Sequence, residues 1–440
     1  MLKNKTAKQN CSFLFLLILF ILISGKAEAQ RYLSDYDSSL FINDTLRPFL
    51  RKMENLSFSA YMQPQFQVAQ AKGIDSYAGG DFREFTDNRF MLRRARLKID
   101  YRLPAKNGSF PAALLTFQFE ATERDVNVRD MFVKIYEPGK HNLSLTAGLF
   151  ARPFGFEVNL SSSFRETPER GRMSQILMPS ERDLGAMFSY ESQNENKKPL
   201  QLKFDIGVFN GQGKSGPAEF DSFKDLISRL AMKPLDLTDQ FSIGAGLSLL
   251  RGGWVQATKY KWETVNKGSG KVFSVDSSIE NIGKKAPRNY YGADAQLIYK
   301  HGWGKTEIRG EYWKGKQPGT ISTTVNPGEL PEAPTYLRDF DGAFFYFLQN
   351  IVNEKWELIA KYDWYDPNVE VSGTELSGIS NFSGADVKFS TLGLGLAHSF
   401  NDNLKILAYY DMVRNEKTAL PGFMEDVKDN VFTWRIQFRF

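Results

Sequence analysis

Apolar and polar residues alternate along most of this chain, and the stretch 89–103 shows the pattern most clearly. Its two parities are, in order, Ala95, Leu97, Ile99, Tyr101 and Leu103, and Arg94, Arg96, Lys98, Asp100 and Arg102. A β-strand places alternate side chains on opposite faces of its sheet. The pattern therefore predicts a strand with one apolar and one basic face. A soluble sheet with one solvated face would carry the same pattern, so this stretch alone does not decide the class of protein.

The alternation recurs about sixteen times and reaches the last residue. The predicted strands lie near 56–68, 89–103, 115–122, 130–136, 143–149, 184–190, 200–209, 223–233, 241–250, 290–299, 306–313, 340–349, 356–365, 389–398, 404–412 and 431–440. Connections after even-numbered strands are short, whereas those after odd-numbered strands are mostly long. This segregation predicts an all-β fold: a transmembrane antiparallel β-barrel of about 16 strands, with short periplasmic turns and long external loops.

The first 29 residues have the features of an export signal. Lys3, Lys5 and Lys8 precede an apolar run over 13–23, and Ala27-Glu28-Ala29 follows it. A basic start, a short apolar core and an A-x-A site are typical of a secretory signal peptide. We predict cleavage after Ala29. The alternative is a retained anchor, but the run is short for a spanning helix. A periplasmic segment over 30–54 and a barrel over 55–440 would follow.

Composition narrows the possible functions only slightly. The mean hydropathy of −0.38 does not indicate a helical membrane protein. The whole chain carries a net charge of +5, of which the predicted signal peptide holds +3, so about +2 remains. Nothing here points to a nucleic-acid partner, and any charge selectivity must come from where the charges sit. Because Cys11, the one cysteine, lies in the predicted signal, we expect no disulfide in the exported protein.

The last strand is aromatic and ends the chain. Its apolar parity consists of Phe432, Trp434, Ile436, Phe438 and Phe440. A terminal Phe on such a strand resembles the signal by which outer-membrane proteins are delivered to their assembly machinery. As an unpaired edge, a strand this long and apolar would aggregate. We therefore predict that it pairs with the first strand and closes the barrel.

Several sequence motifs, densest between 89 and 235, support a family comparison. They are Phe90-Met91-Leu92-Arg93-Arg94-Ala95-Arg96-Leu97, Ala147-Gly148-Leu149-Phe150, Pro153-Phe154-Gly155-Phe156-Glu157, Glu169-Arg170, Pro179-Ser180-Glu181-Arg182-Asp183-Leu184-Gly185, and Asp225 with Arg229-Leu230 and Pro234. In these motifs the chain resembles the phosphate-selective porin O and P family. The resemblance implies a 16-stranded homotrimer in a Gram-negative outer membrane, with the third external loop folded into the lumen. That assigns Ala151–Arg182 to the pore constriction, a role that its length and its position after the fifth strand also indicate.

Arginine and lysine residues of the second strand and the third loop are the candidate anion-binding and pore-lining residues. They are Arg94, Arg96, Lys98, Arg102, Arg152, Arg165, Arg170, Arg172 and Arg182. The planar guanidinium forms paired, charge-assisted hydrogen bonds with phosphate, and a line of cations in a narrow pore would concentrate anions. The competing hypothesis is internal pairing, because the third loop with its flanking Asp183 carries five residues of each sign.

The sequence contains no pattern typical of an enzyme or of a metal or cofactor site. His141, His301 and His398 lie in turns or at a strand end, without a Ser and Asp arrangement typical of a triad. There is no HExxH, paired-Cys, P-loop or GxGxxG motif. We therefore predict a porin for passive diffusion of small anions, with phosphate the leading candidate. The alternatives are a general non-selective porin, a non-conducting structural or adhesive barrel, and a barrel hydrolase.

Overall fold

The computed structural model describes residues 54–105, 111–192, 200–214, 219–268 and 270–440. The predicted signal peptide and all but the last residue of the predicted periplasmic segment lie outside these ranges. Ser57–Phe440 forms one compact unit, which is the barrel. Among the described residues, no helix is long and apolar enough to cross a bilayer.

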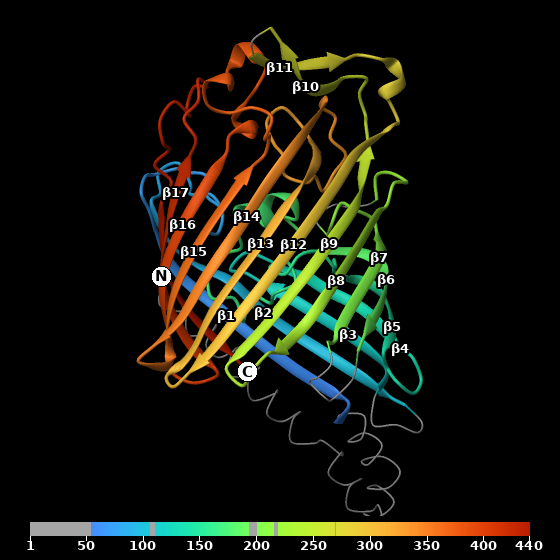
Figure 1. Ribbon diagram of the computed structural model, residues 1–440, viewed down its shortest axis with the longest axis vertical. Coiled ribbons are helices and arrows are strands. Elements are labelled where there is room, and N and C mark those ends of the chain that lie inside the picture. The colour runs from blue at the N-terminus through green and yellow to red at the C-terminus, as the bar shows by residue number, and fades with distance from the viewer. Residues whose placement is uncertain (1–53, 106–110, 193–199, 215–218, 269) are drawn as a thin grey trace, which may run out of the picture. The chain divides into compact units, whose positions relative to one another are not determined.

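Within the described residues, sixteen antiparallel strands form a closed barrel (Figure 1). They are β1 (Leu56–Ala69), β2 (Asn88–Pro104), β3 (Pro111–Ala121), β4 (Val126–Tyr136), β5 (Leu143–Ala151), β6 (Arg182–Glu191), β7 (Leu202–Phe209), β8 (Asp225–Asp236), β9 (Phe241–Val255), β12 (Lys285–His301), β13 (Gly304–Gly319), β14 (Thr335–Ile351), β15 (Asn353–Asp366), β16 (Phe389–Ser399), β17 (Leu404–Asn415) and β18 (Val431–Arg439). All sixteen overlap the strands predicted from the alternation, which confirms the fold class.

The first and last strands pair with each other and close the barrel, as predicted. The backbone N–H of Phe440 donates to the carbonyl of Ala60 at 2.9 Å, and the N–H of Ala60 donates back at 3.1 Å. The ladder continues from Tyr61 opposite Arg439 to Ala69 opposite Val431. Closure removes the edge that the apolar strand β18 would otherwise expose.

Loop lengths differ between the two ends of the barrel. The connection between β14 and β15 is the single residue Val352, and those after β8, β12 and β16 span 237–240, 302–303 and 400–403. At the other end, 152–181 contains the helix α5 (Arg172–Leu177), and 367–388 contains the 3-10 turns Gly373–Glu375, Gly378–Ser380 and Gly384–Asp386. In a bacterial barrel the short turns are periplasmic and the long loops external, and we name the two ends accordingly.

The sequence prediction missed one pair of strands. The long connection between β9 and β12 contains the hairpin β10 (Lys261–Lys267) and β11 (Gly270–Asp276), followed by a 3-10 turn at Ile279–Asn281. Its strands pair residue for residue from Lys261 with Asp276 to Lys267 with Gly270, and Figure 1 shows the hairpin beyond the external ends of the barrel strands. The prediction treated 251–289 as loop because its seven-residue strands show no sustained apolar parity.

Outward faces are apolar and inward faces are mixed. On β2 the outward Leu97 is 41% exposed, whereas the inward Arg94 and Arg96 are buried. The inward face is not polar throughout, however. Inward residues of β8–β14 include fully buried apolar side chains such as Ile227 and Phe344, which form a core with residues of the segment 152–181. A loop that folds against the barrel wall needs apolar side chains to pack on. The period-two pattern does not show which inward positions supply these side chains.

Candidate functional site

The segment 152–181 contacts strands on opposite sides of the barrel, and we call it the inner loop. Gly155 has a φ of 68° and approaches β13 so closely that a Cβ at this position would clash with Glu311 Oε1 and the Trp313 ring. Glu311 Oε2 accepts the backbone N–H groups of Phe156 and Glu157 at 2.9 Å each. Only glycine tolerates this combination of dihedral angle and approach. The Pro-Phe-Gly-Phe-Glu motif therefore attaches the inner loop to the β13 wall.

A second carboxylate holds the start of α5. The Glu157 side chain accepts the backbone N–H of Gly171 at 2.9 Å, the hydroxyl of Ser174 at 2.6 Å and the phenol of Tyr346 at 2.8 Å. Burial would raise the pKa of Glu157, but nearby cations, Lys361 first, lower it. The ionised carboxylate thus joins two parts of the inner loop to strand β14. Figure 1 shows the green segment that contains α5 behind the front strands.

Apolar packing supports these polar contacts. Phe154 of the inner loop is fully buried and meets the Trp313 ring edge-on at 4.7 Å between centroids. Met173 and Leu177 of α5 are 1% exposed and belong to the same core as Phe340. Burying side chains of this size contributes roughly 1.5–3 kcal/mol each. The inner loop is therefore packed as part of the barrel interior.

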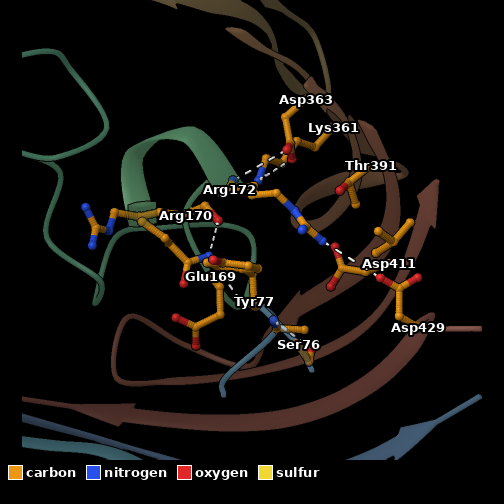
Figure 2. Close-up of a pocket in the computed structure, with 13 residues that line it drawn as sticks. Ser76, Tyr77, Glu169, Arg170, Arg172, Lys361, Asp363, Thr391, Asp411 and Asp429 are labelled. Carbon is orange, nitrogen blue, oxygen red and sulfur yellow. Dashed lines mark hydrogen bonds and ion pairs between the residues drawn. The ribbon is translucent and has the colours of Figure 1, made fainter. Parts of the chain in front are cut away.

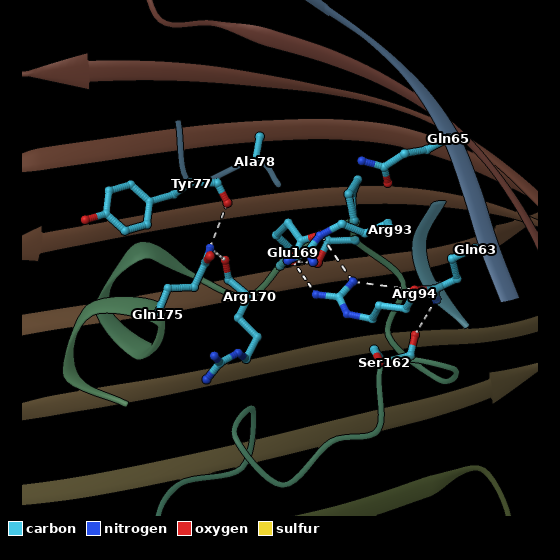
Figure 3. Close-up of polar contacts among 12 residues, drawn as sticks. Gln63, Gln65, Tyr77, Ala78, Arg93, Arg94, Ser162, Glu169, Arg170 and Gln175 are labelled. Carbon is cyan, nitrogen blue, oxygen red and sulfur yellow. Dashed lines mark hydrogen bonds and ion pairs between the residues drawn. The ribbon is translucent and has the colours of Figure 1, made fainter. Parts of the chain in front are cut away.

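Glu169 of the inner loop forms ion pairs with three arginines, and Figure 3 shows two of them, Arg93 and Arg94. The distances to its carboxylate oxygens are 2.7 Å from Arg93, 2.5 Å from Arg94 and 3.2 Å from Arg435. Burial would raise the pKa of Glu169, but the three arginines outweigh it and hold that pKa well below its usual range. One carboxylate meets three guanidinium groups, so this cluster has two cations in excess.

A second network, beside the first, is also richer in cations than in carboxylates. Its carboxylates are Glu120, Asp130 and Glu181, and its cations are Arg96, Arg129, Arg170, Arg182 and Lys214. The shortest pairs join Arg96 to Glu120 and Arg129 to Glu181, both at 2.5 Å. Burial opposes ionisation of Glu181, but Arg129, Arg170 and Arg182 keep its pKa well below the usual range. Together the two networks place an excess of positive charge along β18, β2, β3 and β4.

A narrow polar gap lies next to the inner loop (Figure 2). Its volume is about 30 Å³, room for about two water molecules. Arg172 lies between the rings of Tyr77 and Phe389, at 4.6 and 3.8 Å from their centroids, and forms a long ion pair of 3.8 Å with Asp429. Burial raises the pKa of the Asp429 carboxyl to about 6, although Arg172 opposes this shift.

The wall opposite Arg172 in this gap is acidic. Asp363 and Asp411 line it from β15 and β17, together with Lys361, which pairs with Asp363 at 3.0 Å. Glu169 and Asp429 also line the gap, so four carboxylates meet the three cations Arg170, Arg172 and Lys361 there. The gap is therefore richer in carboxylates than in cations, unlike the two networks.

Not every candidate residue from the sequence lies at this site. Lys98 pairs with Asp100 at 2.7 Å on the periplasmic side, and Arg102 is exposed near the periplasmic end of β2. Arg152 is buried near Asp183 and donates to the Ser180 carbonyl. These three residues are separate from the cation-rich networks.

Arg165 differs from the other arginines of the inner loop. It is 3% exposed, and its Nε and Nη1 atoms have no hydrogen-bond partner among the described residues. Buried guanidinium N–H groups without an acceptor are energetically costly. Among the candidate residues, Arg165 therefore has the most hydrogen-bond donors available to a bound anion.

Cavities lie on both sides of the gap. An external cavity of about 730 Å³ shares Tyr77, Arg172 and Asp429 with the gap. On the periplasmic side, cavities of about 650 and 680 Å³ share Phe164 of the inner loop and Arg439. The described residues thus enclose solvent-sized spaces above and below the inner loop, with the polar gap between them.

Several residues of the site were not singled out from the sequence. Arg93, Arg129 and Arg435 supply three of the cations, and Lys361 and Asp429 line the gap. Arg435 was visible as a charged residue on the inward parity of the last strand. Arg93 lies on the apolar parity of the second strand, and Asp429 lies in a loop, so neither had a local signal.

The histidines of the described residues lie in polar or aromatic surroundings. His301 contacts Thr306 and Gln349, and His398 stacks on Trp356 at 4.2 Å. In the described part of the chain, no three His, Cys, Asp or Glu side chains are placed to hold a metal ion.

Comparison with solved structures identifies the class of barrel. The chain is similar to the anion-selective porin from Comamonas acidovorans, with 12% identity, a TM-score of 0.52 and coverage of 88% of this chain and 99% of that one. It is also similar to the outer membrane channel DcaP of Acinetobacter baumannii, with 10% identity, a TM-score of 0.51 and coverage of 88% and 97%. The fold is therefore that of an outer-membrane porin barrel. No protein-family model and no curated protein matches the sequence, so the resemblance to the phosphate-selective porins stays a prediction.

Proposed function

We propose that this protein is an outer-membrane porin through which small anions diffuse passively, with phosphate the leading candidate. The observation that carries the proposal is the excess of cations in the two networks around Glu169 and Glu181. In a lumen with low-dielectric walls, unpaired positive charge attracts anions more strongly than it would in water. Export by a cleaved signal peptide, insertion through the C-terminal strand and assembly as a homotrimer belong to the same proposal.

Phosphate is favoured over other anions by the kind of cation present. Eight of the nine cations named in the two networks and Arg165 are arginines, whose planar fork matches two phosphate oxygens at once. Arg165 adds donors without a partner among the described residues. We propose that a phosphate passing the inner loop exchanges hydration water for these donors. The gap beside Arg172 has room for only about two waters, so we expect its lining side chains to move when a phosphate passes.

A general, weakly selective porin is the second candidate, and ion pairing favours it. Lys98 pairs with Asp100 at 2.7 Å, and Arg309 pairs with both Glu166 and Glu307. Each such pair leaves little net charge for a passing solute. If pairing dominates, the channel would discriminate by size alone.

The reversal potential of the reconstituted channel separates the two candidates. In a potassium chloride gradient we expect the wild type to prefer chloride, and Arg94→Ala with Arg96→Ala to move the chloride-to-potassium permeability ratio toward unity. Lys98→Gln is the matched control, because Lys98 lies on the same strand face but outside the networks. We expect millimolar phosphate to reduce the wild-type chloride current, and to reduce it less in the double variant. A cation-selective wild type would defeat the anion proposal, and no conductance would defeat the porin proposal as well.

A further inference from the structure

The outward faces of β9, β12 and β13 carry charge only at their external ends. These three strands are neighbours in the barrel (Figure 1). Their carboxylates, Asp294, Glu307 and Glu311, all lie on the inward parity. The charged residues on the outward parity are Arg251, Lys285, Lys314 and Lys316. Arg251 follows the buried Leu250, and Lys314 follows the buried Trp313, which places both cations on the outward face. Four cations and no carboxylate thus occupy this outward surface, which we call the basic rim.

Strand register brings the basic rim together. Arg251 of β9 lies opposite Asn289 of β12, and Asn289 lies opposite Lys316 of β13. Adjacent strands are about 4.8 Å apart, so the backbones at Arg251 and Lys316 are roughly 10 Å apart. Lys314 lies one outward position below Lys316, opposite Tyr291. Residues more than 60 positions apart in sequence therefore form one patch.

Two of the four cations of the basic rim have no ion-pair partner among the described residues. Lys316 pairs with Asp339 at 3.4 Å, and both side chains are about two-fifths exposed. In the described part of the chain, no ion pair or side-chain hydrogen bond involves Arg251 or Lys314. Asp341 is opposite Lys314 in the ladder, but its carboxylate accepts the phenol of Tyr312 at 3.2 Å and the indole N–H of Trp364 at 3.1 Å instead.

The height of the basic rim in the barrel indicates what it faces. Tyr291 and Tyr312, which are 45% and 38% exposed, lie outward at or just below its cations, as interfacial aromatics do in membrane barrels. The rim therefore lies in the headgroup region at the external end. At the same end of the barrel, the outward positions of β3, β5 and β7 carry apolar residues such as Phe119, Leu149 and Val208. These three strands therefore lack a counterpart of the basic rim.

We propose that the basic rim binds the phosphate groups of lipid A, the phosphorylated glycolipid that forms the external leaflet of a Gram-negative outer membrane. Basic side chains at a membrane surface bind anionic headgroups, and a guanidinium with a neighbouring ammonium forms charge-assisted hydrogen bonds with phosphate oxygens. Periplasmic phospholipids are at the other end of the barrel, so the position of the rim favours lipid A. The inference rests on placement of the barrel in the outer membrane and is independent of the solute.

Binding of lipid A to delipidated, refolded barrel tests the proposal. The probe is vesicles of phosphatidylcholine that contain bis-phosphorylated lipid A, and the readout is the amount of lipid A retained per barrel by native mass spectrometry. We expect Arg251→Gln with Lys314→Gln to weaken binding at least tenfold. Arg414→Gln is the matched control, because Arg414 is an exposed cation at the external end of β17 that already pairs with Asp426. It should bind within twofold of wild type.

Two comparison lipids identify the chemical group that is bound. Dephosphorylated lipid A, and phosphatidylglycerol at equal surface charge, should each bind the wild type at least tenfold more weakly than lipid A. Heat-modifiable gel mobility shows that every variant is folded, and bilayer conductance shows whether the pore is unchanged. Wild-type affinity in the double variant, or equal binding of either comparison lipid, would overturn the proposal. Loss of channel activity with retained lipid A binding would defeat the proposed function and leave this inference intact.

Discussion

At the scale of single residues, the environment of a charge decides its role more than its type. Arg94 and Lys98 lie four positions apart on one face of β2, yet Arg94 belongs to a cluster with excess positive charge and Lys98 to a simple pair with Asp100. Glu169 remains ionised because three arginines surround it. The ion pair of Asp429 with Arg172 is 3.8 Å long, and at Asp429 the effect of burial dominates. Residue-level predictions therefore follow from the surroundings of each group.

Leu97→Arg should destabilise the barrel by about 2–4 kcal/mol, the cost of an arginine facing lipid near the bilayer midplane. Leu97 is outward and 41% exposed near the middle of β2. Lys98→Gln loses only a half-exposed pair, so it should change the free energy of unfolding by less than about 1 kcal/mol. Urea titration followed by heat-modifiable mobility measures both. Equal stability of the two variants would contradict the facing of this strand.

Lowering the pH from 7 to 5 should increase chloride preference, with a midpoint near 6. The pKa of Asp429 is raised to about 6 by burial, against about 3.9 in an unfolded chain. Asp429 therefore takes up a proton in this window, and the gap beside Arg172 becomes more positive. The native state also binds more protons than the unfolded state between about pH 4 and 6, so this group's contribution to stability rises as the pH falls.

Asp429→Asn is the control for this pH dependence. It should show the low-pH reversal potential already at pH 7 and lose the part of the titration with a midpoint near 6. Reversal potentials at half-unit steps of pH measure both channels. Identical curves would mean that Asp429 does not influence permeating ions.

At the scale of elements, the inner loop behaves as a folded insert. Glu311 and Glu157 hold its backbone, Phe154 and Met173 anchor it in the apolar core, and Glu169 ties it to β2 and β18. These contacts reach at least four strands, so no single one controls its position. The loop should therefore limit the width of the pore through its bulk, and the cation-rich networks should control selectivity.

Deletion of 159–164 should raise single-channel conductance without changing selectivity. The deleted residues carry no charge, and the anchors at Glu157 and Glu169 remain on either side. Planar-bilayer recording measures the step size and the reversal potential on the same channels. A shift in the permeability ratio as large as that of the Arg94→Ala and Arg96→Ala variant would show that the loop also sets selectivity.

At the scale of the whole molecule, closure joins the two ends of the described barrel. The pairing of β1 with β18 begins at Phe440 and Ala60 and continues over the length of the last strand. Every strand then has two neighbours, and the apolar outward face is continuous. A defect at this seam should affect insertion more than the conductance of the barrels that form.

Deletion of Phe440 should reduce the amount of folded barrel in the outer membrane several-fold. It removes two backbone hydrogen bonds to Ala60 and the aromatic residue that follows β18. Fractionation and immunoblotting measure the membrane pool, and Phe440→Tyr is the matched control, expected to assemble like wild type. Normal levels of the truncated protein would contradict the assembly signal.

The barrel itself could be predicted from the sequence, because its determinant is local. Each strand carries its own period-two pattern, and the lengths of the connections distinguish the two ends. The predicted strands agree with the sixteen observed, and the parity of Leu97 and Arg96 on β2 is as expected. The hairpin at 261–276 was missed, because its short strands are stabilised by pairing and by loop packing around Phe273.

The site depended on contacts between residues distant in sequence, which only the tertiary structure decides. The sequence left two possibilities open for the cations of the second strand and third loop: they face the pore, or they pair with acids. Glu169 meets Arg435 across 266 positions, and Glu157 meets Tyr346 across 189. Alternation tells which face a side chain is on, but not what lies across the lumen. Charge selectivity depends on that opposite partner, because a cation's field is cancelled or retained according to the carboxylate beside it.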